Sequence, residues 1–291
     1  MRSAESQTVP NSAFHIPHGA KSGVIRRPAV AGYYYPAEPN ALAKAVDELA
    51  RVDGPPQSAI GVVVPHGSYR HAGRILWQTL ARVAIPRRCI LVGPTHTGSW
   101  MPWSLMEAGA YRTPLGDVLV DARCAAALRA RCPFLSPDAG AQRGEHAIEV
   151  ILPFLQRLGP RDLAIVPIVM GAEDRAECAQ LAKALAQVVR LQEEPVLLIA
   201  SSDLSHYEPQ VRGAEQDHVL LEAMEHLETL EFLRRVHGEG VLMCGSGAVA
   251  CVLDAAKELG AVQARLTGYG TSAETGGDPH SVIGYAGLVT Q

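Results

Sequence analysis

Short apolar runs alternate with longer amphipathic segments from residue 25 onward. The runs are apolar at nearly every position and lie at residues 60–64, 89–92, 163–169, 196–201, 261–267 and 282–289. Strands of this kind are buried on both faces, whereas a half-solvated sheet shows strict alternation of apolar and polar residues. The pattern therefore predicts a central sheet that is covered by helices on each side.

The amphipathic segments carry apolar residues at three- and four-residue steps, which is the spacing of one helix face. They predict helices at residues 41–50, 73–83, 121–130, 145–158, 175–189, 214–226 and 247–259. Pro153 lies inside the fourth helix, where it lacks a backbone donor and is expected to cause a kink. Strands that alternate with helices in this way predict an α/β fold with a mostly parallel sheet.

No long linker and no shift in composition divides residues 24–291, so we predict a single domain over this range. Residues 1–23 mix polar and turn-forming types without a hydrophobic period. We expect them to form a flexible N-terminal tail.

The composition of the chain argues against several classes of protein. The chain has 291 residues, is 47% hydrophobic and has a net charge of −4, which argues against a nucleic-acid partner. No apolar run approaches the ~20 residues of a membrane-spanning helix, so a membrane protein is not expected. Six cysteines without an apolar signal segment predict reduced thiols and a cytoplasmic location.

Polar, titratable residues follow apolar runs in four segments. These are His66 in VPHGSY, His96 in GPTHTG, Asp203 and His206 in SSDLSHY, and Cys244 in MCGSG. Ligands of open α/β sheets bind at the carboxyl ends of strands, so such residues can converge on one pocket. A single histidine after a strand is more often structural, but two of them favour a metal site for Zn, Cu or Fe.

Cys244 is the preferred third ligand, since a thiolate near a helix N-terminus has a lowered pKa. The alternative is a small buried apolar residue, as we expect for the other cysteines. Glu145 and His146 lie at the start of a predicted helix, where helix capping alone can explain an acidic residue. The alternative is that they contact the substrate or a metal ligand. His206 suits proton transfer near neutral pH, and Asp203 could orient it, reach the metal or cap a turn.

Several segments in fixed order over residues 26–289 resemble the Memo family. They are RRPAVAGYYYP, VPHGSY, GPTHTG, GEHAIEV with LPFLQ, SSDLSHY, MCGSG and YGTSAETGGDPHSVIGYAG. The resemblance implies a fold similar to class III extradiol dioxygenases, which are non-haem Fe(II) enzymes. It also implies a metal triad of His66, His96 and Cys244, in which a thiolate replaces the carboxylate of the usual facial triad.

The chain departs from the family pattern beside the first of these histidines. It reads PHGSY where PHAGY is expected, so Gly67 and Ser68 reshape that side of the pocket. Ser246 and Ala248 in MCGSGAV are further departures. The resemblance also implies association with an AMMECR-type protein and a radical-SAM protein.

The leading hypothesis is a metalloprotein that holds a divalent metal ion, with Fe(II) first and Cu or Zn as alternatives. His206 and Asp203 are its expected catalytic residues, and Tyr69, Glu145 and His146 its expected pocket wall for a small-molecule or peptide ligand. An enzyme of this kind would activate dioxygen beside a hydroxyl-bearing substrate.

Two other functional classes remain open. The protein could be a non-catalytic scaffold that binds a peptide or protein partner in the same cleft. Alternatively, Cys244 could act as a metal-free nucleophile with His66 or His206 as its base.

Overall fold

The computed structural model describes residues 24–49, 54–98, 102–171 and 173–291. The predicted tail at residues 1–23 lies outside this range, so its flexibility stays a prediction, as do the domain limits. The strands are β1 (Ile25–Arg26), β2 (Gly61–Val64), β3 (Arg88–Pro94), β4 (Trp103–Leu105), β5 (Ala110–Thr113), β6 (Gly116–Val120), β7 (Ala164–Met170), β8 (Val196–Ser201), β9 (His206–Glu208), β10 (Ala264–Thr271) and β11 (Val282–Thr290).

These strands form one 11-stranded sheet in the order β1-β5-β6-β7-β3-β8-β2-β11-β10, with β4 paired to β7 and β9 paired to β11. The central neighbours from β6 to β2 are all parallel, and β11 and β10 close one side in antiparallel pairing. The predicted α/β fold with a mostly parallel sheet is therefore confirmed. All of the predicted strands are present, with ends shifted by a few residues.

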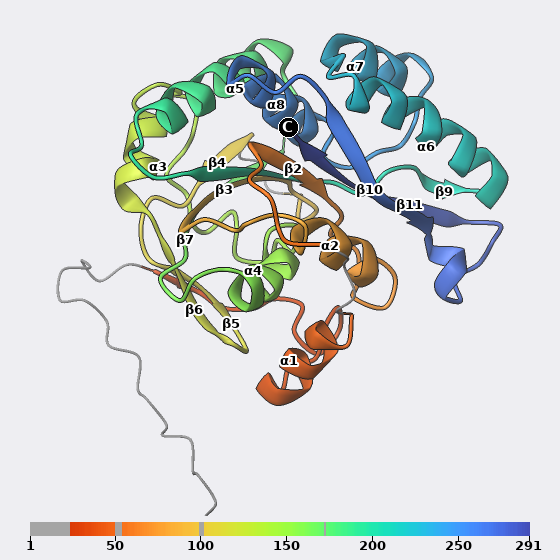
Figure 1. Cartoon of the computed structure of the whole chain (residues 1–291), viewed down its shortest axis with the longest axis horizontal. Coiled ribbons are helices and arrows are strands. Elements are labelled where there is room, and N and C mark those ends of the chain that lie inside the picture. The colour runs from red at the N-terminus through yellow and green to blue at the C-terminus, as the bar shows by residue number, and fades with distance from the viewer. Residues whose placement is uncertain (1–23, 50–53, 99–101, 172) are drawn as a thin grey trace, which may run out of the picture.

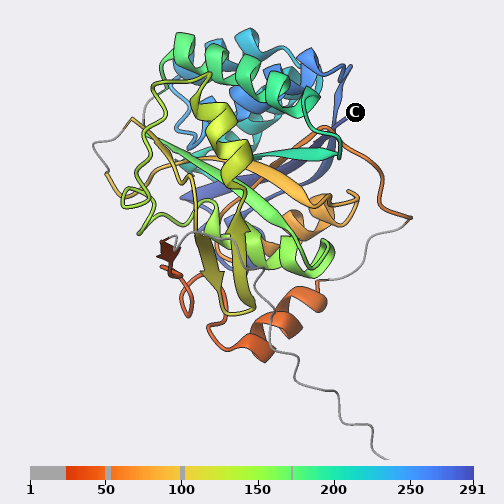
Figure 2. The same ribbon diagram turned by 90° about the vertical axis from the view of Figure 1, so that its left-hand side faces the viewer.

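The helices lie on both faces of the sheet (Figure 1). They are α1 (Pro39–Asp47), α2 (Gly73–Leu80), α3 (Ala122–Arg129), α4 (Leu152–Leu158), α5 (Arg175–Arg190), α6 (Gln210–Glu225), α7 (Thr229–Gly238) and α8 (Ser246–Glu258), with short 3-10 turns η1 (Glu149–Ile151) and η2 (Ser272–Thr275). In Figure 2, green and blue helices lie above the sheet, and the orange and light-green helices lie below it.

Strand β8 shows why both faces need cover. Leu198 and Ala200 belong to the apolar core shared with α5, α7 and α8, whereas Leu197 and Ile199 belong to the core shared with α1, α2 and α4. All four side chains are fully buried. An apolar run without alternation thus predicts a two-sided sheet correctly, because successive side chains point to opposite faces.

The predicted helix at residues 145–158 is wrong in its first half. Residues 145–148 are not helical, residues 149–151 form η1, and α4 begins only at Leu152. Pro153 lies in the first turn of α4, where backbone N–H groups have no partner within the helix, so proline costs no helical hydrogen bond there. The expected kink is therefore absent, and Glu145 and His146 do not cap a helix.

Buried Asp217 attaches α6 to the sheet. Its carboxylate accepts hydrogen bonds from the Ser205 backbone N–H and the Tyr269 hydroxyl, each at 2.9 Å. Gly284 faces it on β11, where a Cβ atom would lie 1.9 Å from Asp217 Oδ2. Glycine is required at position 284 because no side chain fits beside the carboxylate.

We expect the stability contribution of Asp217 to depend on pH. Burial raises the pKa of Asp217, so the native protein binds this proton more tightly than the unfolded chain does. The resulting stabilisation is complete below the unfolded pKa of ~3.9 and is lost as pH rises through the native pKa. Wild type should therefore gain stability relative to Asp217→Asn as pH falls from 7 toward 4, measured by urea denaturation. A difference that is constant or of opposite slope would contradict this role.

Among the described residues, no helix combines the length and the apolar character that crossing a bilayer requires.

Candidate metal centre

Three neighbouring strands deliver the candidate residues to one edge of the sheet. Strands β3, β8 and β2 are adjacent and parallel, so their carboxyl ends lie together. His66 follows β2, His96 follows β3 and Asp203 follows β8. Cys244 lies at the same edge, in the loop just before α8.

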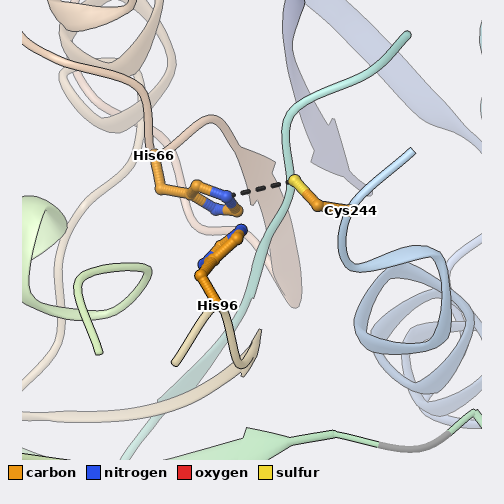
Figure 3. Close-up of side chains that lie close together, drawn as sticks. All are labelled: His66, His96 and Cys244. Atoms are coloured by element: carbon orange, nitrogen blue, oxygen red, sulfur yellow. Dashed lines mark hydrogen bonds between the residues drawn. The ribbon is translucent and has the colours of Figure 1, made fainter. Parts of the chain in front are cut away.

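The side chains of His66, His96 and Cys244 lie close together at this edge of the sheet (Figure 3). Their candidate ligand atoms all lie within 4.8 Å of one another. Cys244 Sγ is 3.2 Å from His66 Nε2, and the two imidazole centroids are 5.0 Å apart. The structure thus brings together the three residues that the resemblance implies, from segments far apart in the chain.

The hydrogen bonds of His66 fix its tautomer. Ser201 Oγ donates its only hydrogen to the Ala147 carbonyl at 2.7 Å, so it must accept from His66 Nδ1, also at 2.7 Å. His66 Nε2 is then unprotonated and faces Cys244. Burial lowers the pKa of His66 well below its usual value, which keeps the ring neutral. A neutral imidazole with a fixed orientation is the form that binds metal ions.

Glu145 orients His96 in a similar way. Its carboxylate accepts from His96 Nδ1 at 2.9 Å and also from the backbone N–H groups of His96, His146 and Ala147. Burial opposes ionisation of Glu145, but the hydrogen bonds outweigh it and lower its pKa to about 2. Burial also lowers the pKa of His96, yet the Glu145 charge outweighs this and leaves it raised. His96 Nδ1 therefore carries a hydrogen, and Nε2 is available to a ligand.

Cys244 does not have the lowered pKa that its position near a helix predicts. Burial, and then the nearby Asp203 carboxylate, raise the pKa of the Cys244 thiol well above its usual value. The helix field is outweighed because the thiol is desolvated beside a carboxyl group. The isolated thiol stays protonated, and a metal ion would be needed to hold the thiolate.

Asp203 and His206 lie beside the same sulfur, and one ligand atom of each is within 4.8 Å of it. Asp203 does not orient His206 by a hydrogen bond. Its Oδ1 accepts instead from the backbone N–H groups of His66 at 2.8 Å and Gly67 at 3.3 Å. His206 Nδ1 contacts the carbonyls of Leu204 at 2.7 Å and Leu242 at 3.1 Å, which only accept. His206 Nε2 is therefore free to accept a proton.

The residues that we expect at the pocket wall differ in their placement. The His146 ring lies 4.5 Å from His96 and 5.6 Å from His66 between centroids, and Tyr34 packs edge-on against it at 4.8 Å. The Tyr69 hydroxyl donates to the Val150 carbonyl at 2.8 Å. Roles for His146 and Tyr69 in ligand binding stay predictions.

The sequence pattern indicates no role at the site for Ser201. The structure shows instead that this hydroxyl determines which His66 nitrogen faces the cleft. A serine at the end of a buried strand gives no signal of such a role, because its two partners come from distant segments. Tyr34, which covers His146, was likewise unmarked by the sequence pattern.

The donor set fits a divalent metal ion. Two imidazoles and a sulfur combine borderline and soft ligands, a chemistry suited to Fe(II), Zn(II) and copper rather than Mg²⁺ or Ca²⁺. Both imidazoles have their second nitrogen engaged, as is usual for metal-bound histidines. His66, His96 and Cys244 would hold the ion.

Comparison with known proteins supports the family resemblance that the sequence segments indicate. The family model of Memo-like proteins matches residues 26–289. MEMO1 family proteins of Methanopyrus kandleri and Aquifex aeolicus are each 34% identical, over 91% of this chain and 98% of the relative. A MEMO1 family protein of Methanococcoides burtonii is 35% identical over 92% of this chain and its own full length. The chain therefore belongs to the Memo family.

Proposed function

We propose that this protein is a metal-dependent enzyme that binds a divalent ion, Fe(II) first and Cu or Zn as alternatives, through His66, His96 and Cys244. The observation that carries the proposal is the pair of fixed tautomers. A hydrogen bond from His66 Nδ1 to Ser201 leaves the His66 Nε2 unprotonated, and a hydrogen bond from His96 Nδ1 to Glu145 makes Nε2 the His96 nitrogen that a metal ion would bind, near the Cys244 sulfur. An engaged second ring nitrogen is typical of metal-bound histidines.

The reaction class that this cleft suits best is an oxidation by dioxygen. A bound redox-active ion would supply Lewis acidity and a path for electrons to dioxygen. When dioxygen cleaves the ring of a catechol, all of the electrons that reduce dioxygen come from the catechol, so the reaction needs no external reductant. His206 Nε2 would accept the proton that the substrate hydroxyl loses, because its Nδ1 hydrogen is engaged by backbone carbonyls. Tyr34 and His146 form part of the wall that limits access of water.

The metal-free nucleophile is the weaker alternative. A thiol acts as a nucleophile in its thiolate form, and the raised pKa of Cys244, caused by burial and then by Asp203, disfavours that form. His66 Nε2 contacts the sulfur but is too weak a base to ionise it, since burial lowers the His66 pKa.

Metal uptake and oxygen consumption test this proposal in two steps. The protein, purified without oxygen and supplied with Fe(II), should retain about one equivalent of metal, and Cys244→Ala should not. The loaded protein should then consume dioxygen with at least one member of a panel of substituted catechols. Absence of metal uptake would contradict the proposal. Bound metal without oxygen consumption on the whole panel would favour the scaffold class instead.

Removing the Glu145 charge should weaken metal binding. We expect Glu145→Gln to lower the affinity for Co(II) about 10- to 100-fold, because His96 loses its ionised acceptor and its fixed tautomer. Competition with a chelator measures the change. Glu215→Gln, an exposed site on α6, is the matched control and should behave as wild type. Equal affinities for Glu145→Gln and wild type would show that Glu145 has no role in orienting the ligand.

The family relationship also supports a cellular context. We propose that the protein works in the cytoplasm with an AMMECR-type and a radical-SAM protein. All six cysteines are free and five are buried, which fits a reducing compartment.

A further inference from the structure

A glycine beside the candidate metal site admits an aromatic ring. Gly67 follows His66 directly, at the position where the family pattern PHAGY has alanine. A Cβ atom on Gly67 would lie 2.7 Å from Tyr285 Cε1 and 3.1 Å from its hydroxyl oxygen. Gly67 has no left-handed backbone conformation, so space rather than φ requires glycine here. An alanine at position 67 would therefore displace the Tyr285 ring.

Tyr285 reaches this place from the middle of β11. Its side chain is 2% exposed, and its ring packs with Ala72 and Ile75, which hold the ring in place. The direction of the ring is therefore determined by packing, and its hydroxyl end lies against the loop that carries His66. The contact with Gly67 places this hydroxyl one residue from the candidate ligand His66, and Asp203 and Cys244 are near enough to influence its ionisation.

The Tyr285 hydroxyl makes no hydrogen bond with any residue that the structure describes. Its oxygen is not completely enclosed by the described residues. Burial, and then Asp203, raise the pKa of Tyr285, so the hydroxyl keeps its proton at neutral pH. It is a donor without an acceptor, fixed beside a metal ligand. Buried hydroxyls normally have a partner, so an acceptor is expected to come from outside the chain.

We propose that Tyr285 is a substrate-binding residue, which donates a hydrogen bond to a negatively charged oxygen of a metal-chelating ligand, and that Gly67 sets its reach. This inference rests on the proposed metal site. The ligand class is an oxygen chelator such as a phenolate, carboxylate or hydroxamate. Gly67 makes the contact specific to chains with glycine at this position, because alanine would displace the ring.

Titration of the Co(II)-loaded full chain with acetohydroxamate tests the assignment. This small chelator presents a charged oxygen, and the visible Co(II) bands report its binding. The variants are Tyr285→Phe, Gly67→Ala and the two combined. Tyr269→Phe, which loses a hydroxyl that donates to Asp217, is the control for Tyr285→Phe. Gly238→Ala, at an exposed glycine where a Cβ atom would meet nothing within 4 Å, is the control for Gly67→Ala. Co(II) affinity and thermal unfolding are measured for each, so that altered folding or metal loading is seen separately.

Tyr285→Phe should weaken acetohydroxamate binding at least about tenfold, as for loss of a hydrogen bond to a charged group, with unchanged Co(II) affinity. Gly67→Ala should weaken it about three- to tenfold. The combined variant should be no weaker than Tyr285→Phe alone, because both changes remove one contact. The two controls should bind as wild type.

The outcomes separate this inference from the function on which it rests. Wild type that binds no Co(II) would overturn both. Wild type that binds Co(II) but not acetohydroxamate would overturn the ligand class. Equal acetohydroxamate affinity in wild type and Tyr285→Phe, or additive losses in the combined variant, would overturn the role of Tyr285 while leaving the metal site intact.

Discussion

Replacing Cys244 or His66 by alanine is expected to lower the affinity for Co(II) at least about 100-fold, equivalent to about 2.8 kcal/mol. Each change removes one of three converging ligand atoms, and water is a poor substitute for a thiolate or an oriented imidazole. Binding can be measured by competition with a chromophoric chelator under anaerobic conditions.

The controls separate ligation from folding. His226→Ala removes an exposed histidine at the end of α6 and should leave affinity unchanged. Cys244→Ser keeps the size of the side chain but not the soft donor, so its affinity should fall nearly as far as that of Cys244→Ala. Cys244→Ala or His66→Ala with the affinity of wild type would contradict the triad.

The second large effect concerns the stability of the fold. Glu149→Ala should lower the free energy of unfolding by about 3–5 kcal/mol, because it leaves the buried Arg26 guanidinium without its counter-charge. Glu149 is fully buried, and its carboxylate also accepts from the backbone N–H groups of Ala29 and Val30 and from the Tyr35 hydroxyl. The loss of one side chain therefore leaves several donors unpartnered.

A double variant distinguishes the contribution of the ion pair to stability from that of general packing. Arg26→Met combined with Glu149→Leu removes both charges and should recover part of the stability lost in Glu149→Ala. Urea denaturation measures each variant, with an unchanged slope indicating that both states keep their exposed surface. A combined variant less stable than Glu149→Ala would show that burial of the pair is not the source of the effect.

The Arg26–Glu149 pair also shows what sequence periodicity misses. Glu149 falls within the helix predicted at residues 145–158, and the local pattern indicates no partner for it. It lies instead in η1 and binds Arg26, whose guanidinium also donates to the Glu145 carbonyl beside the metal cluster. Such contacts join residues more than a hundred positions apart, and a pattern read in local windows cannot find them.

The central strands were predictable because a strand that is buried on both faces has a continuous apolar sequence, as in β8. Strands β1, β4, β5, β6 and β9 were missed, since they are short and lie toward the edges. Helix α7 was missed as well, because it buries little more than Phe232 and Val236 among charged residues.

The site was predictable to the extent that it follows from strand ends. His66 and His96 follow β2 and β3, two parallel strands on either side of β8, and their convergence follows from that topology. The raised pKa of Cys244 was not predictable, because it arises first from burial and then from Asp203, which follows β8 and is distant from Cys244 in the chain. Tyr285 was not predictable either, since a tyrosine within a strand resembles any core residue.

X-ray absorption spectroscopy of the Zn(II)-loaded protein is the most direct test of the metal centre. Two nitrogen scatterers at about 2.0–2.1 Å and one sulfur at about 2.3 Å should fit the wild-type spectrum, and the sulfur should be absent from Cys244→Ala. A wild-type spectrum that requires only nitrogen and oxygen would place the ion elsewhere and contradict the account.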